Sequence, residues 1–260
     1  MDMGRDMQIK GIIFDMDGTL LDSLGAYQQA FNDGVGRCGL GPATVESLAE
    51  KLNEGLNLEG VIVSLYPGHD DPSFLTACRQ EIIAAFRQVN DGVLPVLPGA
   101  RETLAVLSSN GLKLGVATGR TQPPDQVQRL LDAVGIGHFF EAIVTTAEVR
   151  ERKPAPDAIF ECARRLDLPP AECLVVGDSV ADVDAGKAAG ATVVGVLTGV
   201  ANEARLAARG PAAIVGDLRE LLALVENDGI VPSPCPHPNP LPEGEGTLRE
   251  GDTRRSSPLL

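Results

Sequence analysis

Short apolar runs that alternate with helical segments constrain the fold of this chain more than any other feature. The runs are Ile9–Phe14, Leu112–Thr118, Ala142–Thr145, Cys173–Gly177, Thr192–Leu197 and Ala212–Val215. Apolar residues at helical spacing predict helices between the later runs, at 100–109, 125–134, 157–166, 180–189 and 218–225. Strands that alternate with helices in this way favour an α/β fold built on a parallel sheet with right-handed crossovers.

A purely helical pattern interrupts this alternation from residue 24 to residue 95. Its breaks are expected at Gly39–Pro42 and at Tyr66–His69, where turn-forming residues gather. We therefore predict a core made of residues 1–23 and 96–229, with a helical insertion at 24–95. Proline stands at every second position from Pro232 to Pro242, which excludes helix and inner strand, so 230–260 is predicted to be a disordered tail.

The composition narrows the range of functions. The chain has 260 residues and a net charge of −14, which disfavours nucleic acid and anionic membrane as partners. Aromatic residues are 3% of the chain and tryptophan is absent, so platforms for stacking bases are not expected. The five cysteines show no paired spacing, which is typical of a cytoplasmic protein with reduced thiols. No apolar run approaches the length of a membrane span. For the oligomeric state, we expect a monomer or a homodimer.

The sequence Asp15-Met16-Asp17-Gly18-Thr19 directly follows the first apolar run. Two carboxylates at the end of a buried strand are costly unless a cation or a shared proton compensates them. Gly18 and Thr19 supply a tight turn whose backbone N–H groups are suited to an anion. A surface turn of the same composition is the alternative interpretation.

Three further polar segments occur where the fold would bring them to the same place. Thr118-Gly119-Arg120 and Asp178-Ser179 follow two other strands, and the carboxyl ends of parallel strands meet at one edge of the sheet. Lys153-Pro154 precedes a helix, and Asp182 lies one helical turn after Asp178. Taken singly, each has a structural explanation: a strand-end turn, a surface lysine or salt bridge, or a helix cap of the kind expected from Asp22 and Ser23.

Together and in this order, the four segments resemble the haloacid dehalogenase-like (HAD) hydrolase superfamily, and most closely its phosphoglycolate phosphatase and β-phosphoglucomutase branch. The resemblance covers residues 9–225. It implies a Rossmann-like three-layer core with an inserted α-helical cap. It also implies a Mg²⁺-dependent phosphatase that acts on a small phosphorylated metabolite through an aspartyl-phosphate intermediate.

The resemblance assigns a role to each residue of the four segments. Asp15 would be the nucleophile and Asp17 the general acid and base. The catalytic set would be Asp15, Asp17, Thr118 and Lys153. The phosphate would be bound by Gly18, Thr19, Thr118, Gly119, Arg120 and Lys153. The metal ligands would be Asp15, Asp178 and, through its backbone carbonyl, Asp17, with Asp182 orienting a metal-bound water or Lys153.

Several functions stay open at this point. Dehalogenases and phosphonate hydrolases of this superfamily lack the second aspartate, so the presence of Asp17 disfavours both. A phosphomutase would need cations in the cap for a second phosphate, but residues 24–95 carry four basic and nine acidic residues, which favours hydrolysis. A non-catalytic phosphate-binding protein is a third possibility, disfavoured because Asp15, Asp17 and Lys153 are all present. The substrate itself, whether phosphoglycolate, a sugar phosphate, a nucleotide or pyrophosphate, is not indicated by the sequence.

Overall fold

A computed structural model describes residues 9–53, 56, 58–90 and 94–227 of the chain. The predicted tail at 230–260 lies outside the described residues, as do residues 1–8. None of the described helices is long and apolar enough to cross a membrane. The four described cysteines, Cys38, Cys78, Cys162 and Cys173, are free thiols.

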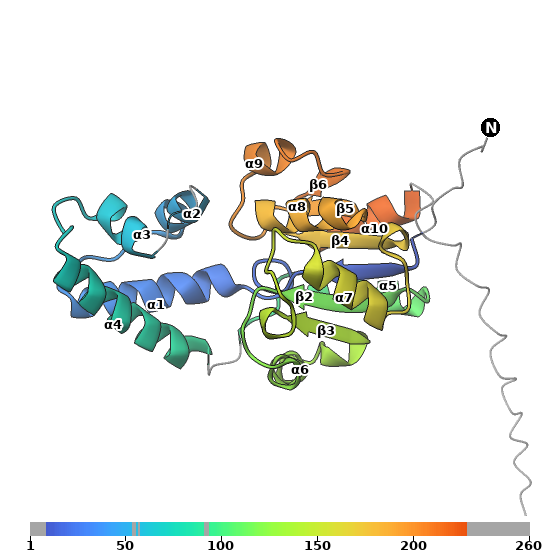
Figure 1. Cartoon of the computed structure of the whole chain (residues 1–260), viewed down its shortest axis with the longest axis horizontal. Coiled ribbons are helices and arrows are strands. Elements are labelled where there is room, and N and C mark those ends of the chain that lie inside the picture. Colours follow the sequence, from blue (N-terminus) through green and yellow to red (C-terminus); the bar gives the residue numbers. More distant parts are fainter. Residues whose placement is uncertain (1–8, 54–55, 57, 91–93, 228–260) are drawn as a thin grey trace, which may run out of the picture.

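A six-stranded parallel sheet forms the centre of the larger part of the molecule (Figure 1). In spatial order the strands are β3 (Ala142–Thr145), β2 (Lys113–Thr118), β1 (Gly11–Phe14), β4 (Cys173–Gly177), β5 (Thr192–Val196) and β6 (Ala213–Val215). All five pairings are parallel. The predicted parallel α/β sheet is thus confirmed, and β1 lies between β2 and β4, where its carboxyl end has a strand end on either side.

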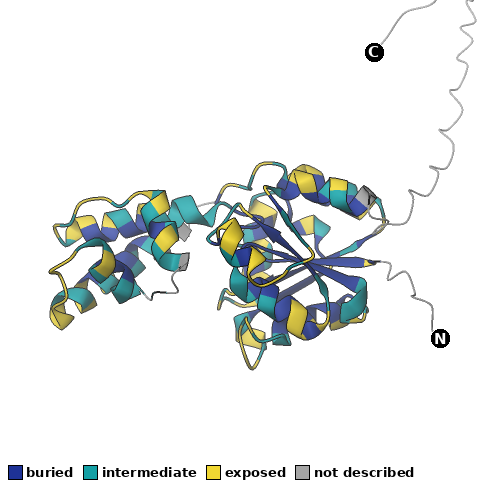
Figure 2. Cartoon of the chain, turned by 90° about the horizontal axis from the view of Figure 1, so that it is seen from above, coloured by how far each residue is buried: buried dark blue, intermediate teal, exposed yellow. Residues whose placement is uncertain are grey.

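Helices cover both faces of the sheet and make three layers. One face packs against α5 (Ala100–Ser109), α6 (Pro124–Ala133) and α10 (Leu218–Asn227), and the other against α7 (Asp157–Arg165) and α8 (Val180–Ala189). Successive side chains of a strand point to opposite faces, so Ile12 and Phe14 belong to the first hydrophobic cluster and Ile13 to the second. Because both faces are covered, β1 and β4 are buried along their whole length and β2 is buried except at its first residue (Figure 2).

Short elements complete the sheet-containing part. The 3₁₀ turns η1 (Gly137–Phe139), η2 (Thr146–Glu148) and η3 (Pro170–Glu172) lie in its connections. The helix α9 (Glu203–Ala207) follows β5, and its residue Leu206 is fully buried against the second cluster.

In the described part of the segment between β1 and α5, four helices form a separate body, at the left of Figure 1. They are α1 (Ser23–Arg37), α2 (Val45–Asn53), α3 (Leu58–Leu65) and α4 (Pro72–Asn90). They share their own hydrophobic cluster, which includes Phe31, Leu48, Ile62 and Ile82. Helices therefore interrupt the α/β part between β1 and α5, as the fold class predicted, while the division of the chain at 24–95 stays a prediction.

The contact between α1 and α4 depends on a small residue. A Cβ atom at Gly34 of α1 would lie 2.5 Å from the Cα atom of Ile82 in α4, so only glycine allows the two backbones to approach this closely. At the start of α1, Asp22 caps the helix as predicted, because its side chain accepts a hydrogen bond from Gly25 N at 3.2 Å.

Candidate active site

The polar residues predicted at the strand ends meet at one edge of the sheet. Asp15 follows β1, and its backbone N–H donates to the carbonyl of Val176 in β4 at 2.8 Å. Thr118 ends β2 on one side, and Asp178 follows β4 on the other. The order β2-β1-β4 therefore places the Asp15 position between two polar strand ends, which is the arrangement expected from the parallel sheet.

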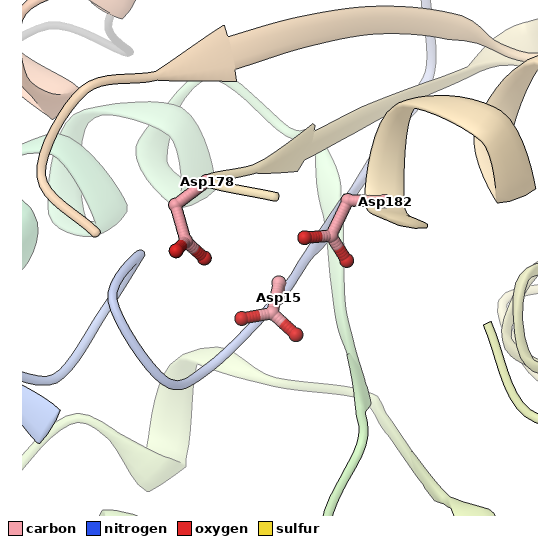
Figure 3. A group of neighbouring side chains, drawn as sticks. All are labelled: Asp15, Asp178 and Asp182. Atoms are coloured by element: carbon pink, nitrogen blue, oxygen red, sulfur yellow. The ribbon is translucent and has the colours of Figure 1, made fainter. Parts of the chain in front are cut away.

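Three buried carboxylates gather at this edge: those of Asp15, Asp178 and Asp182 (Figure 3). Each offers an oxygen atom within 4.8 Å of the oxygens of the other two. The residues are only 8%, 3% and 2% exposed, respectively. Asp182 belongs to the first turn of α8, and its Oδ2 accepts hydrogen bonds from the Ser179 N–H and hydroxyl at 3.1 and 2.5 Å. This reciprocal capping box fixes the side chain that reaches the cluster.

Lys153 binds two of these carboxylates. Its Nζ lies 2.6 Å from Asp15 Oδ1 and 2.5 Å from Asp182 Oδ1, and it also donates to the Ala117 carbonyl at 2.9 Å. All three N–H donors of the ammonium group are thus used. Three carboxylates and one ammonium leave this group of side chains with a formal charge of −2.

Burial and the crowding of like charges change the pKa values in the cluster. Burial raises the pKa of Asp15 well above its ordinary range, and Asp182 and Asp178 add to this against the opposing effect of Lys153. Burial and then Asp182 raise the pKa of Asp178 from 3.8 to about 7, although the Val200 N–H opposes this. Burial alone would lower the pKa of Lys153, but Asp15 and Asp182 raise it, so Lys153 is a cation at neutral pH.

These residues fit a divalent metal ion. Buried carboxylate oxygens with an uncompensated charge of −2 are the ligands that a hard cation such as Mg²⁺ prefers. The cluster contains two of the predicted ligands, Asp15 and Asp178, together with Asp182, which was predicted to lie beside the metal, whereas the Asp17 side chain points to Arg120. A contribution of the Asp17 backbone carbonyl stays a prediction.

Asp17 is held by Arg120 in a two-pronged ion pair. The Nε and one terminal nitrogen of Arg120 donate to the two carboxylate oxygens of Asp17, each at 2.7 Å. The side chains are 10% exposed for Arg120 and 30% exposed for Asp17. The backbone around Arg120 is fixed as well, because its N–H donates to the buried Thr118 hydroxyl at 3.2 Å and its carbonyl accepts from the Thr146 hydroxyl at 2.6 Å.

Gly18 and Thr19 make contacts within the protein. The Gly18 N–H donates to the Leu21 carbonyl at 2.9 Å, and the Thr19 hydroxyl donates to Asp178 Oδ1 at 3.2 Å. In this structure both residues therefore support the loop and the carboxylate cluster. Their role as phosphate ligands, like that of Gly119, stays a prediction.

A loop that we did not predict from the sequence holds Asp178 from the other side. The Val200 N–H donates to Asp178 Oδ2 at 2.8 Å, and the Thr198 hydroxyl donates to the Gly18 carbonyl at 2.6 Å. A Cβ atom at Gly199 would lie 1.8 Å from Asp178 Oδ2, so this position requires glycine. The signal in the sequence was that Thr198-Gly199 follows β5 as Thr118-Gly119 follows β2.

A cavity of about 1160 Å³ opens above the cluster and reaches the helical insertion. Its charged lining comes from the sheet-containing part: Asp15, Asp17, Arg120, Arg129, Lys153, Asp178 and Asp182. The insertion lines it mainly with apolar and aromatic side chains: Leu24, Tyr27, Leu52, Leu58, Ile82, Ile83 and Phe86. The cavity thus joins a charged floor to a largely apolar wall.

Comparison with known proteins agrees with this fold and site. The family model described as haloacid dehalogenase-like hydrolase matches residues 12–196. Over 214 residues, the chain is 31% identical to a phosphoglycolate phosphatase from Pseudomonas fluorescens, an alignment that covers 81% of this chain and 78% of that protein. The chain therefore belongs to the haloacid dehalogenase-like hydrolase family.

Solved structures support the same placement. A HAD family hydrolase from Deinococcus radiodurans R1, with bound phosphate and sodium, has a TM-score of 0.71 and 26% identity, over 87% of this chain and 99% of that one. A protein assigned as a β-phosphoglucomutase from Thermotoga maritima has a TM-score of 0.65 and 25% identity, over 84% and 99% of the two chains. Both the enzyme class and the branch expected from the sequence motifs are thus borne out.

Proposed function

We propose that this hydrolase is a Mg²⁺-dependent phosphatase that cleaves a small phosphomonoester through an aspartyl-phosphate on Asp15. The observation that carries the proposal is the position of Asp15 at the floor of the cavity, beside Lys153 and two further buried carboxylates. The phosphoglycolate phosphatase relatives and the phosphate bound in a structural neighbour support a phosphate ester as the substrate.

In the proposed reaction, a carboxylate oxygen of Asp15 attacks phosphorus in line with the leaving oxygen. The P–O bond to the leaving group breaks, and Asp17, as its acid form, gives that oxygen a proton. Water then attacks the phosphorus of the aspartyl-phosphate, Asp17 takes a proton from that water, and inorganic phosphate and free Asp15 are formed. Asp17 thus returns to its starting state in each cycle.

The charges around Asp15 suit this chemistry. Lys153 is a buried cation that already contacts the nucleophile, so it is placed to stabilise charge on the transferring phosphoryl oxygens. Thr118 is proposed to donate its hydroxyl to the same group. A Mg²⁺ ion held by Asp15 and Asp178, with Asp182 beside them, would neutralise the repulsion between the nucleophile and the phosphate.

Hydrolysis is favoured over a phosphomutase by the contacts of the cap cations. Arg37 pairs with Glu81 at 3.1 Å, Arg79 pairs with Glu59 at 2.9 Å, and Lys51 lies 3.1 Å from Glu50. None of these three cations is among the residues that line the cavity. The described part of the cap therefore offers no cation for a second sugar phosphate.

We further propose that residues 24–95 act as a cap that closes over the core of 1–23 and 96–229. The two connections run side by side where Leu21 bridges Val96, with Asp22 N donating to the Pro95 carbonyl at 2.9 Å. A cross-link between the cap and the core is expected to lower turnover, and unchanged turnover would contradict cap closure.

The central test is the release of inorganic phosphate from p-nitrophenyl phosphate and from a panel of phosphoglycolate, sugar phosphates, nucleotides and pyrophosphate. We expect Mg²⁺-dependent release that EDTA abolishes and that Asp15→Asn removes without unfolding the protein. Asp184→Asn is the matched control, since Asp184 lies on α8 outside the carboxylate cluster, has a side chain 35% exposed, and lies 3.7 Å from Arg209. A wild-type protein inert toward every ester, or an active Asp15→Asn variant, would refute the proposal.

A further inference from the structure

The ion pair between Asp17 and Arg120 conflicts with the proton transfer that the proposed function gives to Asp17. Both carboxylate oxygens of Asp17 accept short N–H bonds from one guanidinium. Proton transfer to a leaving group needs an O–H on one of these oxygens, and an O–H fits poorly against a guanidinium that already donates to both of them. Catalysis therefore requires Asp17 to part from Arg120 when substrate is bound.

Arg120 has the donors to hold another anion in place of Asp17. A guanidinium has five N–H donors, and only two of them are used by Asp17. The remaining donors have no acceptor among the described residues, and Arg120 lines the cavity. Lys153, by contrast, already donates to three oxygens.

The rest of the described cavity offers no equal site for a second anion. The cap wall is largely apolar and bears none of the described cap cations. Arg129, the remaining cation in the lining, is on an exposed stretch of α6, with 67% of its side chain accessible and a pairing to Asp125 at 2.9 Å. An ion pair so open to water contributes little binding energy, whereas Arg120 is largely shielded from solvent.

We propose that Arg120 recognises a second anionic group, such as a carboxylate, on the leaving part of the substrate, and that this exchange of partners releases Asp17, which then takes up a proton from solvent and gives it to the leaving oxygen. The inference rests on the proposed function and narrows it to phosphomonoesters that carry a nearby second negative charge. Arg120 thus determines specificity and also holds Asp17 in an ion pair until the second anion binds. When a substrate lacks the second anion, Asp17 stays paired with Arg120.

Binding of two unreactive phosphonates tests the recognition step directly. 3-Phosphonopropionate carries a carboxylate and propylphosphonate does not, while neither has a phosphate ester bond to cleave. By calorimetry in Mg²⁺, the wild-type protein is expected to bind the first about 10- to 100-fold more tightly, the value of a charge-assisted hydrogen-bond pair. Arg120→Gln should remove this preference, and Arg129→Gln, the matched control from the same cavity, should keep it.

Each outcome of the binding test has a definite consequence. A preference that survives in Arg120→Gln, a preference that is lost in Arg129→Gln, or a wild-type protein that binds neither compound would overturn the inference. A wild-type protein that shows the preference but hydrolyses no ester would refute the proposed phosphatase activity and leave the assignment of Arg120 intact.

Turnover tests whether recognition of the second anion reaches the chemical step. In Arg120→Gln, kcat/KM for phosphoglycolate should fall by about 10- to 100-fold more than kcat/KM for ethyl phosphate, because only phosphoglycolate loses a contact to its carboxylate. Arg120→Lys should retain only part of the kcat/KM for phosphoglycolate, because lysine keeps the positive charge but lacks the two parallel N–H donors of the guanidinium. Equal losses for both substrates would show that Arg120 has only a structural role.

Discussion

Replacement of Asp178 by asparagine is expected to stabilise the metal-free protein. Asp178 is a buried carboxylate near Asp15 and Asp182, and the side chains of this cluster, with Lys153, carry a formal charge of −2. Asparagine has nearly the same shape, and its carbonyl oxygen can still accept the Val200 N–H. The substitution therefore removes a charge that is unfavourable without metal while it keeps the packing.

The magnitude follows from the pKa of Asp178, which rises from 3.8 to about 7 on folding, chiefly through burial. Because the folded state holds the proton more tightly than the unfolded state, this carboxyl lowers stability as pH rises from about 4 to about 7. A shift of about three pKa units corresponds to a cost of about 4 kcal/mol at pH 8, and about 2 kcal/mol at pH 5. Asp178→Asn should recover most of this cost.

Urea unfolding in EDTA, followed by far-ultraviolet circular dichroism because the chain has no tryptophan, measures the effect. Asp178→Asn should be more stable than the wild-type protein at pH 8, with a smaller gain at pH 5, while the partly exposed Asp184→Asn control should change stability by less than about 0.5 kcal/mol. Mg²⁺ at 100 times its dissociation constant should stabilise the wild-type protein by about 2.7 kcal/mol and the variant by less. A variant that is less stable than wild type at pH 8, or a gain independent of pH, would refute the reasoning.

Three other substitutions probe the site and the cap. Lys153→Met should lower kcat by about 10²- to 10³-fold in phosphate-release assays and lower the urea midpoint, because it leaves buried carboxylates without their cation; activity near wild type would contradict this role. Gly199→Ala should weaken Mg²⁺ binding at least about tenfold by calorimetry, since its Cβ would displace Asp178, and unchanged affinity would show that the loop does not position this carboxylate. Gly34→Ala should destabilise the cap by about 1–3 kcal/mol, measured by urea unfolding. Gly36→Ala on the same helix, with open space around it, should be neutral or stabilising. Equal effects of the two substitutions would contradict the close packing of α1 and α4.

The sequence was sufficient to predict the sheet because strands buried on both faces are nearly continuous apolar runs. The predicted strands at 142–145 and 173–177 have the observed bounds, and those at 112–118 and 192–197 differ by one residue. The five-residue helix α9 was missed, since one helical turn and a half has no period to detect. The order of the strands in the sheet could not be predicted from the sequence pattern, because it depends on which strands pair across the inserted cap.

The site was predictable as far as it depends on strand ends. A parallel sheet places Asp15, Thr118 and Asp178 along one edge, and the observed order β2-β1-β4 makes them neighbours there, with a lysine before α7 available to join them. The choice of partner for Asp17 was not predictable, because Arg120 lies 103 residues away and the pairing depends on the loop after β2. The same holds for Gly199, whose contact with Asp178 joins the ends of β4 and β5.

The two groups of charges at this edge act differently on an incoming phosphate. The cluster of Asp15, Asp178, Asp182 and Lys153 keeps a charge of −2, whereas the pair of Asp17 and Arg120 is neutral. Two unit charges of like sign about 4 Å apart repel by about 4 kcal/mol at an effective dielectric constant near 20. A phosphate dianion therefore enters the first group at little cost only when a divalent cation is present, so phosphate and metal must strengthen each other's binding. The neutral pair imposes no such requirement, since a second anion meets the positive charge of Arg120 and the guanidinium donors that Asp17 leaves unused. This separates the metal-dependent step from the step that selects the substrate.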